Sequence, residues 1–270
     1  MMFNIKFSII ITSKFLLYFY ICLDKQKQIT MSINKVTIVG IKGFKGSGKD
    51  TVASMISYIL YDGIMKASYN TWLLYHKNGF VENDEIIIHF ADKLKDDISE
   101  FCGIDRKLLD RQEIKENYYY NFKTGIVSTN IKDIDCVINT VLEYDNLSTL
   151  LLLNNNNVSI KIRALLQYYG TNVIRNHFWH EAFIRYTMNK AFDIKNNKGQ
   201  CIITDARFED ECMAIKYYGG KIIRIDRRVN NDNHESEQIK ISQDDYVIDN
   251  TGTLVGLFYK VLKFVTDYMV

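Results

Sequence analysis

The stretch Gly43-Phe-Lys-Gly-Ser-Gly48-Lys49-Asp50-Thr51 decides how this sequence is interpreted. Its spacing, G-x-x-x-x-G-K, matches a phosphate-binding loop. Glycines let the backbone turn its N–H groups toward phosphate oxygens, and a helix that begins after the loop adds its positive end. The run KVTIVGI at 35–41 before the loop is typical of a buried parallel strand, and apolar residues at helical spacing follow up to about Leu60. Strand, glycine-rich turn and helix together predict a nucleotide-binding loop rather than an ordinary turn.

Most residues of this loop are expected to contact nucleotide phosphates, and Lys49 is suited to neutralise charge that develops on a departing γ-phosphate. The loop residues in question are Gly43, Lys45, Gly46, Ser47, Gly48, Lys49, Asp50 and Thr51. The residue after the lysine is usually Ser or Thr and binds magnesium, but here it is Asp50, and Thr51 follows one step later. Asp50 could act on magnesium directly or through water, or cap the helix. The metal ligand therefore stays open.

Strand and helix patterns alternate along the rest of the chain, which predicts an α/β fold. Further strands are expected at 86–90 (IIIHF), 201–205 (CIITD), 221–226 (KIIRID) and 246–248 (YVI). Helices are expected at 92–101, 161–170, 208–218 and 254–269, the second of them ending at Gly170. We expect a three-layer α/β/α arrangement with a parallel central sheet and an inserted, mostly helical lobe on the substrate side.

The segment 117–159 is polar and rich in Tyr and Asn, which favours an inserted lobe or a long connection. Residues 1–30 contain two apolar runs interrupted by Lys14, a pattern that fits an upstream extension better than a membrane anchor. We therefore expect a fold within 31–270 and no membrane partner.

Composition excludes some functions. The formal net charge is only +2, which argues against generic nucleic-acid binding. The five cysteines form no C-x-x-C pair, so a zinc site or disulfide framework is not indicated. Free thiols in a reducing compartment, and hence a cytoplasmic location, are expected.

Several short runs in a fixed order make the chain resemble the deoxynucleoside monophosphate kinase family of phages and large DNA viruses. The sequence GSGKDT at 46–51 is similar to that family's variant of the loop, and FADKLK at 90–95 is similar to its F-A-x-x-L-K run. IRALLQYYGT at 162–171 resembles its R-x-L-x-Q-x-x-G-T stretch, and ITDAR at 203–207 resembles its D-x-R motif. The resemblance implies an adenylate-kinase-like P-loop fold, ATP and Mg²⁺ as the phosphoryl donor system, and a deoxynucleotide as acceptor.

On this resemblance we assign site roles as hypotheses. Lys49, Arg207, Arg227 and Asp205 are the candidate catalytic residues, and Asp50, Thr51 and Asp205 are the candidate metal ligands. Arg163 and Gln167, four residues apart on one helix face, are expected to hold the acceptor. Lys95 and Trp179 complete the candidate substrate site.

Three of these assignments compete with plainer interpretations. Asp205 could instead be the N-cap of the helix that follows it. The charged segment 228–240 after Arg227 could close over ATP as a lid or be an ordinary solvated run. Trp179 could stack on a base, but packing in the core ranks first for this tryptophan and for Phe178, Tyr168 and Tyr169.

Two other classes of function remain. Another small-molecule P-loop kinase, acting on phosphomevalonate or a coenzyme precursor, would share the loop and the arginines. A non-catalytic nucleotide-binding module would bind ATP without acceptor-dependent turnover. The sequence leaves open which base is accepted, whether ribose is excluded and whether the chain forms a homodimer.

Overall fold

The computed structural model describes residues 36–77, 84–130, 136–139, 157–227 and 245–270. All of them belong to one compact unit, Val36–Val270. The predicted extension at 1–30, the lid-like segment at 228–240 and part of 117–159 lie outside the described residues, so the predicted division of the chain stays a prediction. Within the described residues, the structure contains no helix with the length and apolar character needed to span a bilayer.

A parallel sheet of five strands forms the centre of the unit, as predicted, with the order β2-β7-β1-β8-β9. The strands are β1 (Ile38–Lys42), β2 (Ile87–Ile88), β7 (Cys201–Ile203), β8 (Lys221–Asp226) and β9 (Tyr246–Asp249). Every pairing between neighbours is parallel. All five residues of β1 are buried, which is the environment that its unbroken apolar sequence requires.

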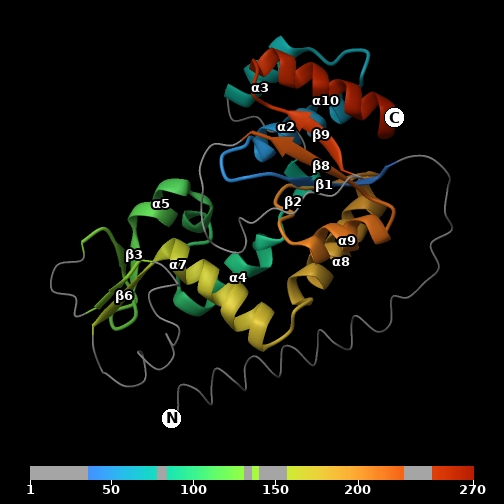
Figure 1. The fold of residues 1–270 in the computed structure, drawn as a ribbon. Helices are drawn as coiled ribbons and strands as arrows, with labels where there is room; N and C mark the ends of the chain where they lie inside the picture. Colours follow the sequence, from blue (N-terminus) through green and yellow to red (C-terminus); the bar gives the residue numbers. More distant parts are fainter. Residues whose placement is uncertain (1–35, 78–83, 131–135, 140–156, 228–244) are drawn as a thin grey trace. The chain divides into compact units, whose positions relative to one another are not determined.

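Helices cover both faces of this sheet (Figure 1). The helices are α2 (Lys49–Asp62), α3 (Tyr69–Lys77), α8 (Ala182–Lys198), α9 (Glu209–Tyr217) and α10 (Leu254–Tyr268). Adjacent residues of β1 show the division: Val39 packs in a core with Trp72 of α3 and Phe258 of α10, whereas Ile38 packs with Met188 of α8. Because successive strand residues face opposite ways, this alternation defines three layers.

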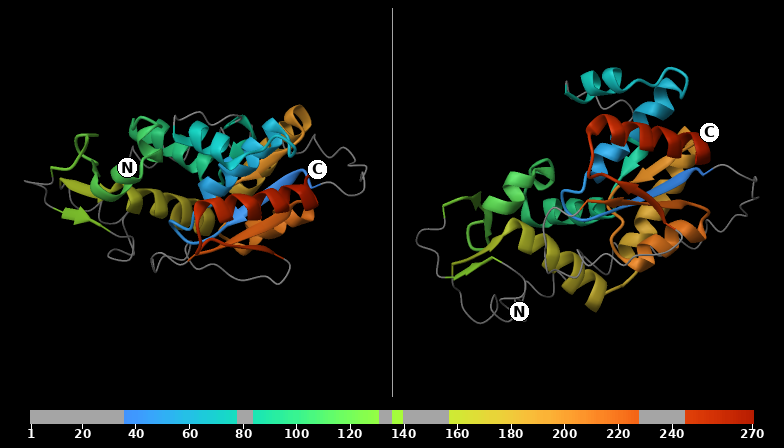
Figure 2. Two further views of the ribbon diagram at one scale, coloured as in Figure 1. Left: turned by 90° about the horizontal axis from the view of Figure 1, so that it is seen from above. Right: turned by 45° about the horizontal axis from the view of Figure 1, so that its top comes forward.

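The lobe between β2 and α8 has a core of its own, which includes Leu109, Ile160 and Ile162. Its helical elements are α4 (Ala91–Cys102), η2 (Leu108–Asp110), α5 (Gln112–Asn117), α7 (Ile162–Gln167) and the π-helix η4 (Tyr168–Arg175), whereas the short 3-10 helix η1 (Asp84–Ile86) precedes β2. The lobe also carries a four-stranded sheet, ordered β4-β3-β6-β5, which the sequence does not predict. Its strands are β3 (Tyr119–Asn121), β4 (Val127–Ser128), β5 (Cys136–Ile138) and β6 (Val158–Lys161). Figure 2 shows β3 and β6 beside α7 in two further views.

The helix that begins at Ile162 does not end at Gly170, so that prediction is wrong. The chain continues as the π-helix η4 to Arg175. Gly170 serves close packing instead, because a Cβ atom added there would lie 3.1 Å from Cδ2 of Leu94 in α4. The absence of a side chain lets η4 lie against α4, and this continuation carries Arg175 to Asp210 of α9.

Candidate active site

The glycine-rich loop joins β1 to α2, as predicted. Gly46 and Gly48 have φ values of 74° and 97°, in the left-handed region that favours glycine. Gly43 has no room for a side chain, since an added Cβ would lie 2.5 Å from Ser47 Oγ and 3.2 Å from the Ile225 carbonyl oxygen. These constraints fix the loop's path around the start of α2.

Lys49, the first residue of α2, is directed back across the loop. Its Nζ donates to the carbonyl oxygens of Gly43 at 2.7 Å and of Phe44 at 2.9 Å. The ammonium group therefore lies inside the turn that the motif predicts to surround nucleotide phosphates. A lysine held in this way places a positive charge beside the backbone N–H groups of a helix N-terminus.

Asn250, which follows β9, holds the loop from the opposite side. Its side chain is buried, and its Nδ2 donates to the Ser47 carbonyl oxygen at 2.8 Å. Its backbone N–H donates to the Asp226 carbonyl oxygen at 3.1 Å, which ties it to β8. An added Cβ on Gly48 would lie 2.7 Å from Asn250 Nδ2, so this contact also requires glycine in the loop.

Of the candidate metal ligands in the loop, Asp50 is the better placed. Its side chain is 86% exposed in the first turn of α2, next to the loop, and Thr51 is half-buried. The N-cap of α2 is Gly48, so Asp50 is not its cap. No cluster of three or more Asp, Glu, His or Cys side chains in the described ranges could hold a metal ion by itself. Mg²⁺ in phosphoryl-transfer sites uses one or two carboxylates together with substrate phosphates, and an exposed Asp50 fits that pattern.

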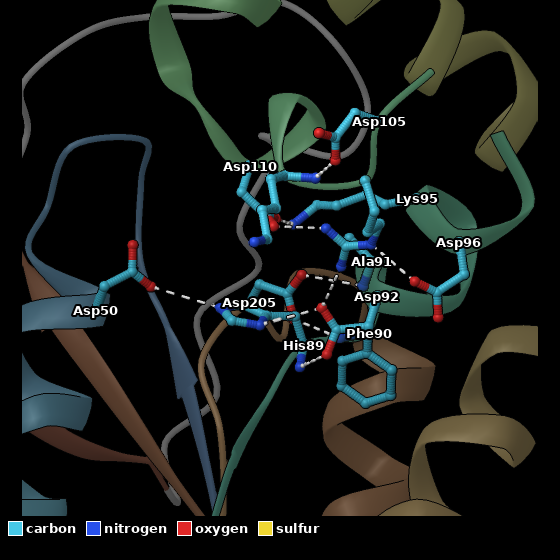
Figure 3. Close-up of polar contacts among 12 residues, drawn as sticks. Asp50, His89, Phe90, Ala91, Asp92, Lys95, Asp96, Asp105, Asp110 and Asp205 are labelled. Atoms are coloured by element: carbon cyan, nitrogen blue, oxygen red, sulfur yellow. Dashed lines mark hydrogen bonds and ion pairs between the residues drawn. The ribbon is translucent and has the colours of Figure 1, made fainter. Parts of the chain in front are cut away.

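Asp205, after β7, is not the N-cap of the helix that follows it, so that alternative is wrong. Its Oδ1 accepts the Phe90 backbone N–H at 2.6 Å, and its Oδ2 accepts that of Ala91 at 3.2 Å. It therefore caps α4, a helix 115 residues earlier in the sequence, and not the helix α9 that follows it. Figure 3 shows this carboxylate at the start of α4.

His89 lies between Asp50 and Asp92 (Figure 3). Its Nδ1 is 3.4 Å from Asp92 Oδ1, and its Nε2 is 4.0 Å from Asp50 Oδ1. Burial acts to lower the pKa of His89, but the hydrogen bond to Asp92 and the charges of Asp205 and Asp92 raise it overall. Burial conversely opposes ionisation of Asp92, yet the contacts with His89 hold the pKa of that carboxyl well below its usual range.

Lys95 extends from α4 to the 3-10 helix η2. Its Nζ pairs with Asp110 Oδ1 at 2.8 Å, and the same carboxylate binds Arg106 at 2.6 Å. Arg106 also contacts Asp96 at 2.7 Å. The predicted substrate residue Lys95 is thus held by an ion-pair network (Figure 3).

Arg163, the predicted acceptor residue, meets the phosphate-binding loop through Glu116 of α5. Oε1 of Glu116 binds Arg163 Nε at 2.5 Å and Lys45 Nζ at 2.6 Å. Lys161 lies 3.5 Å from the other oxygen. Burial opposes ionisation of Glu116, but these cations lower its pKa to about 2. Gln167 lies on the same short helix as Arg163, four residues later.

Lys115, adjacent to Glu116, adds a cation that the sequence does not predict. Its half-buried ammonium is close to Lys95, Arg163 and Arg207, three of the predicted site residues. Burial and these positive charges lower the pKa of Lys115 to about 8, and Asp110 opposes the shift. Lys95, Arg163 and Arg207 are therefore near enough to Lys115 for their charges to act on it.

The loop that carries Arg207 is held by Glu211 of α9. One oxygen of this buried carboxylate accepts the backbone N–H groups of Arg207 at 2.8 Å and Phe208 at 3.0 Å. Burial is the main reason that the pKa of Glu211 rises to about 8. Arg207 itself is half-buried.

Arg175, at the end of η4, is a further charged residue that the sequence does not predict. Its guanidinium binds both oxygens of Asp210 at 2.5 Å and lies 3.7 Å above the ring of Phe208. It thereby joins η4 to the loop of Arg207. Its position eight residues after Gln167 could have signalled it, had the helix not been expected to end at Gly170.

Two of the predicted site residues, Arg227 and Trp179, are not shown to lie near Lys115. Arg227 is exposed just after β8, and its charge is not among those named above as acting on Lys115. Trp179 is half-buried, 5.3 Å from the guanidinium of Arg185. The prediction of core packing is correct for Tyr169, which is buried, but wrong for Phe178, which is 43% exposed in the segment between η4 and α8.

The parallel sheet, the glycine-rich loop and the helices on both faces define a P-loop kinase-like fold. The family model for deoxynucleotide monophosphate kinase matches residues 37–261, and the chain belongs to that family. It is also similar to a protein of Acanthamoeba polyphaga mimivirus named "Putative deoxynucleotide monophosphate kinase". The identity is 26% over 237 residues, which cover 86% of this chain and 97% of the relative.

Proposed function

We propose that this protein transfers the γ-phosphate of ATP to a deoxynucleoside monophosphate, producing the deoxynucleoside diphosphate and ADP. The observation that carries the proposal is the shared carboxylate of Glu116. It joins Lys45 of the donor loop to Arg163 of the acceptor motif, so the two motifs meet within hydrogen-bonding distance. A kinase whose two substrates are both anions needs such a meeting point of cations.

In this proposal the chain's residues act on charge and position. Lys49 and the loop N–H groups hold the β- and γ-phosphates, and Arg163 with Gln167 holds the acceptor. An oxygen of the acceptor phosphate bonds to the γ-phosphorus as the bond to the β,γ-bridging oxygen breaks, and ADP leaves. That acceptor oxygen is already anionic, so no general base is required. Arg207 stabilises the charge on the transferring group, and Arg227 would join it from the end of β8.

Mg²⁺, when bound, would screen the negative charge of the phosphates. Asp50 is the residue we assign to it, with Thr51 beside it. Asp205 has both oxygens engaged with the start of α4, so we place it second as a metal ligand. Its closer role is to position α4 and the residues that α4 carries.

The proposed reaction supplies deoxynucleotides for DNA synthesis, and the viral source of the relative makes a large DNA virus the natural setting. The free thiols Cys102, Cys201 and Cys212 are compatible with the reducing cytoplasm of a host cell.

The direct test is an ADP-release assay on the full chain with ATP, Mg²⁺ and each of dTMP, dGMP, dCMP, dAMP and their ribo counterparts. Acceptor-dependent turnover is expected with one or more deoxy acceptors. Turnover only with a different small-molecule acceptor, such as phosphomevalonate, would instead indicate another P-loop kinase. ATP binding without any acceptor-dependent ADP release would identify a non-catalytic module.

A further inference from the structure

Arg175 ends the helical segment that carries the acceptor motif. The helix α7 holds Arg163 and Gln167, and it continues directly into the π-helix η4, whose last residue is Arg175. π-Helices are rare and are frequent at functional sites. The side chain of Arg175 is only 10% exposed. A charged group with so little access to water must be held by specific partners.

Three partners of Arg175 belong to the segment that directly follows Arg207. Nη2 of Arg175 contacts both carboxylate oxygens of Asp210 at 2.5 Å, and the guanidinium lies 3.7 Å from the centre of the Phe208 ring. Nη1 is 3.8 Å from Glu211 Oε1. Charge-assisted hydrogen bonds and a guanidinium above a ring restrict both the position and the orientation of the groups they join. The segment after Arg207 is therefore fixed against the end of η4.

The loop of Arg207 is held on both sides of that residue. Before it, the Asp205 carboxylate accepts the backbone N–H groups of Phe90 and Ala91 at the start of α4, at 2.6 and 3.2 Å. After it, Oε2 of Glu211 accepts the backbone N–H of Arg207 itself at 2.8 Å. Both α4 and η4 belong to the lobe. Contacts with the lobe, as well as β7, therefore set the place of Arg207.

We infer that Arg175 positions Arg207 for phosphoryl transfer. The helical segment that carries the acceptor motif would then also set the place of the arginine that acts on the transferring group. This inference rests on the proposed kinase function. Arg175 is a positioning residue, because its guanidinium is engaged by Asp210 and the Phe208 ring. A misplacement of about 1 Å at a reacting site can cost about 100-fold in rate, so the contact is expected to act on kcat.

The kinetic test compares Arg175→Met with the matched control Arg185→Met on the full chain, using ATP, Mg²⁺ and the best deoxy acceptor. Arg185 also has a carboxylate partner and a ring beside it, Glu181 at 3.0 Å and Trp179 at 5.3 Å, but its side chain is 54% exposed. We expect Arg175→Met to lower kcat about tenfold or more and to leave the KM for ATP unchanged. Arg175→Lys should recover part of the loss. A kcat no lower than that of Arg185→Met would overturn the inference.

A double-mutant cycle separates positioning from a general loss of stability. If Arg175 acts through Arg207, Arg175→Met should lower kcat by less than about twofold in an Arg207→Met background, because the arginine that it positions is already gone. Equal fold losses in the two backgrounds would show that Arg175 acts by another route. Asp210→Asn removes the same ion pair with little change of shape, so it should reproduce the loss of kcat even if Arg175→Met fails to fold.

The second test needs no turnover. The backbone N–H groups of Arg207 and Phe208 both donate to Glu211, and their hydrogen exchange can be followed by NMR. Arg175→Met should speed this exchange about tenfold or more, and should leave that of Ile41 in β1 unchanged. Unchanged exchange in the loop would overturn the inference. If the wild type turned over no deoxynucleotide, the proposed function would be wrong, and the exchange rates would still decide whether Arg175 holds the loop.

Discussion

Asp205 Oδ1 accepts the backbone N–H of Phe90 at 2.6 Å, and this bond connects the end of β7 to the start of α4. A carboxylate at a helix N-terminus satisfies backbone donors and interacts favourably with the helix dipole. In this protein the motif aspartate positions a helix that begins 114 residues before it at Ala91, and that helix carries Lys95. These hydrogen bonds therefore join the D-x-R motif to the F-A-x-x-L-K run, although the two motifs are far apart in the sequence.

The first prediction concerns Asp205→Ala. Loss of both bonds to α4 should lower the free energy of unfolding by about 1–2 kcal/mol, measured by urea denaturation without nucleotide or Mg²⁺. Asp226→Ala, at the exposed end of β8, is the control and should change stability much less. If Asp205→Ala left stability unchanged but raised the Mg²⁺ concentration needed for activity, Asp205 would be a metal ligand and not a helix cap.

Glu116 gives the second prediction, because it compensates both Lys45 and Arg163. Glu116→Gln should destabilise the protein at pH 7 and should lower the KM for the acceptor, since the two cations become available to substrate anions. The pKa of Glu116 is lowered from 4.5 to about 2, so the ionised carboxylate stabilises the fold above pH 4.5. That contribution is lost as the pH falls toward 2.

The matching measurement is urea denaturation of wild type and Glu116→Gln at pH 7 and near pH 3. The stability difference should be smaller at the lower pH. A difference that grows on acidification would show that the Glu116 carboxylate does not stabilise the folded state. An increased acceptor KM in Glu116→Gln would mean instead that Glu116 holds Arg163 in its productive position.

The third prediction tests the support of the phosphate-binding loop. Asn250→Ala leaves the Ser47 carbonyl oxygen without its buried donor and should weaken ATP binding by roughly tenfold, or about 1.4 kcal/mol. Asn70→Ala, on the exposed surface of α3, is the matched control. Calorimetric titration with ATP measures both. Equal ATP affinity in the two variants would show that the loop keeps its conformation without Asn250.

Glu211 gives the fourth prediction, which has the opposite pH dependence to Glu116. Burial raises its pKa from 4.5 to about 8, so the folded protein holds a proton that the unfolded chain releases between these values. Stability due to this group therefore falls as the pH rises from about 4.5 to 8. Wild type should lose at least ~1 kcal/mol relative to Glu211→Gln over that range, by urea denaturation. A constant difference would place the Glu211 pKa near its ordinary value.

The sequence predicts the central sheet and the loop well because their signals are local. β1, the loop and α2 are contiguous, and each has the periodicity of its own structure. KIIRID is predicted as a strand at 221–226, and β8 has the same bounds. Gly170 misleads for the same local reason: glycine is a common helix end, but here it provides space against Leu94, a contact that no local pattern encodes.

The residues that connect the site are harder to predict, since their roles depend on partners far away in the sequence. Glu116 is 71 residues from Lys45 and 47 from Arg163, and Asn250 is 203 residues from Ser47. On a sequence, a glutamate in a charged segment is typical of a solvated surface. The small sheet of the lobe is missed because β3 and β6 are short strands from segments of mixed polarity.

The most direct test of the central claim follows the phosphate itself. The full chain is incubated with γ-labelled ATP, Mg²⁺ and each deoxynucleoside monophosphate, and the labelled product is separated, with Lys49→Ala in parallel. The account predicts label in a deoxynucleoside diphosphate for at least one acceptor, and a loss of at least ~100-fold in Lys49→Ala. Label that appears only as free phosphate, or equal transfer by Lys49→Ala, would contradict the assignment of this chain as a deoxynucleoside monophosphate kinase that works through its glycine-rich loop.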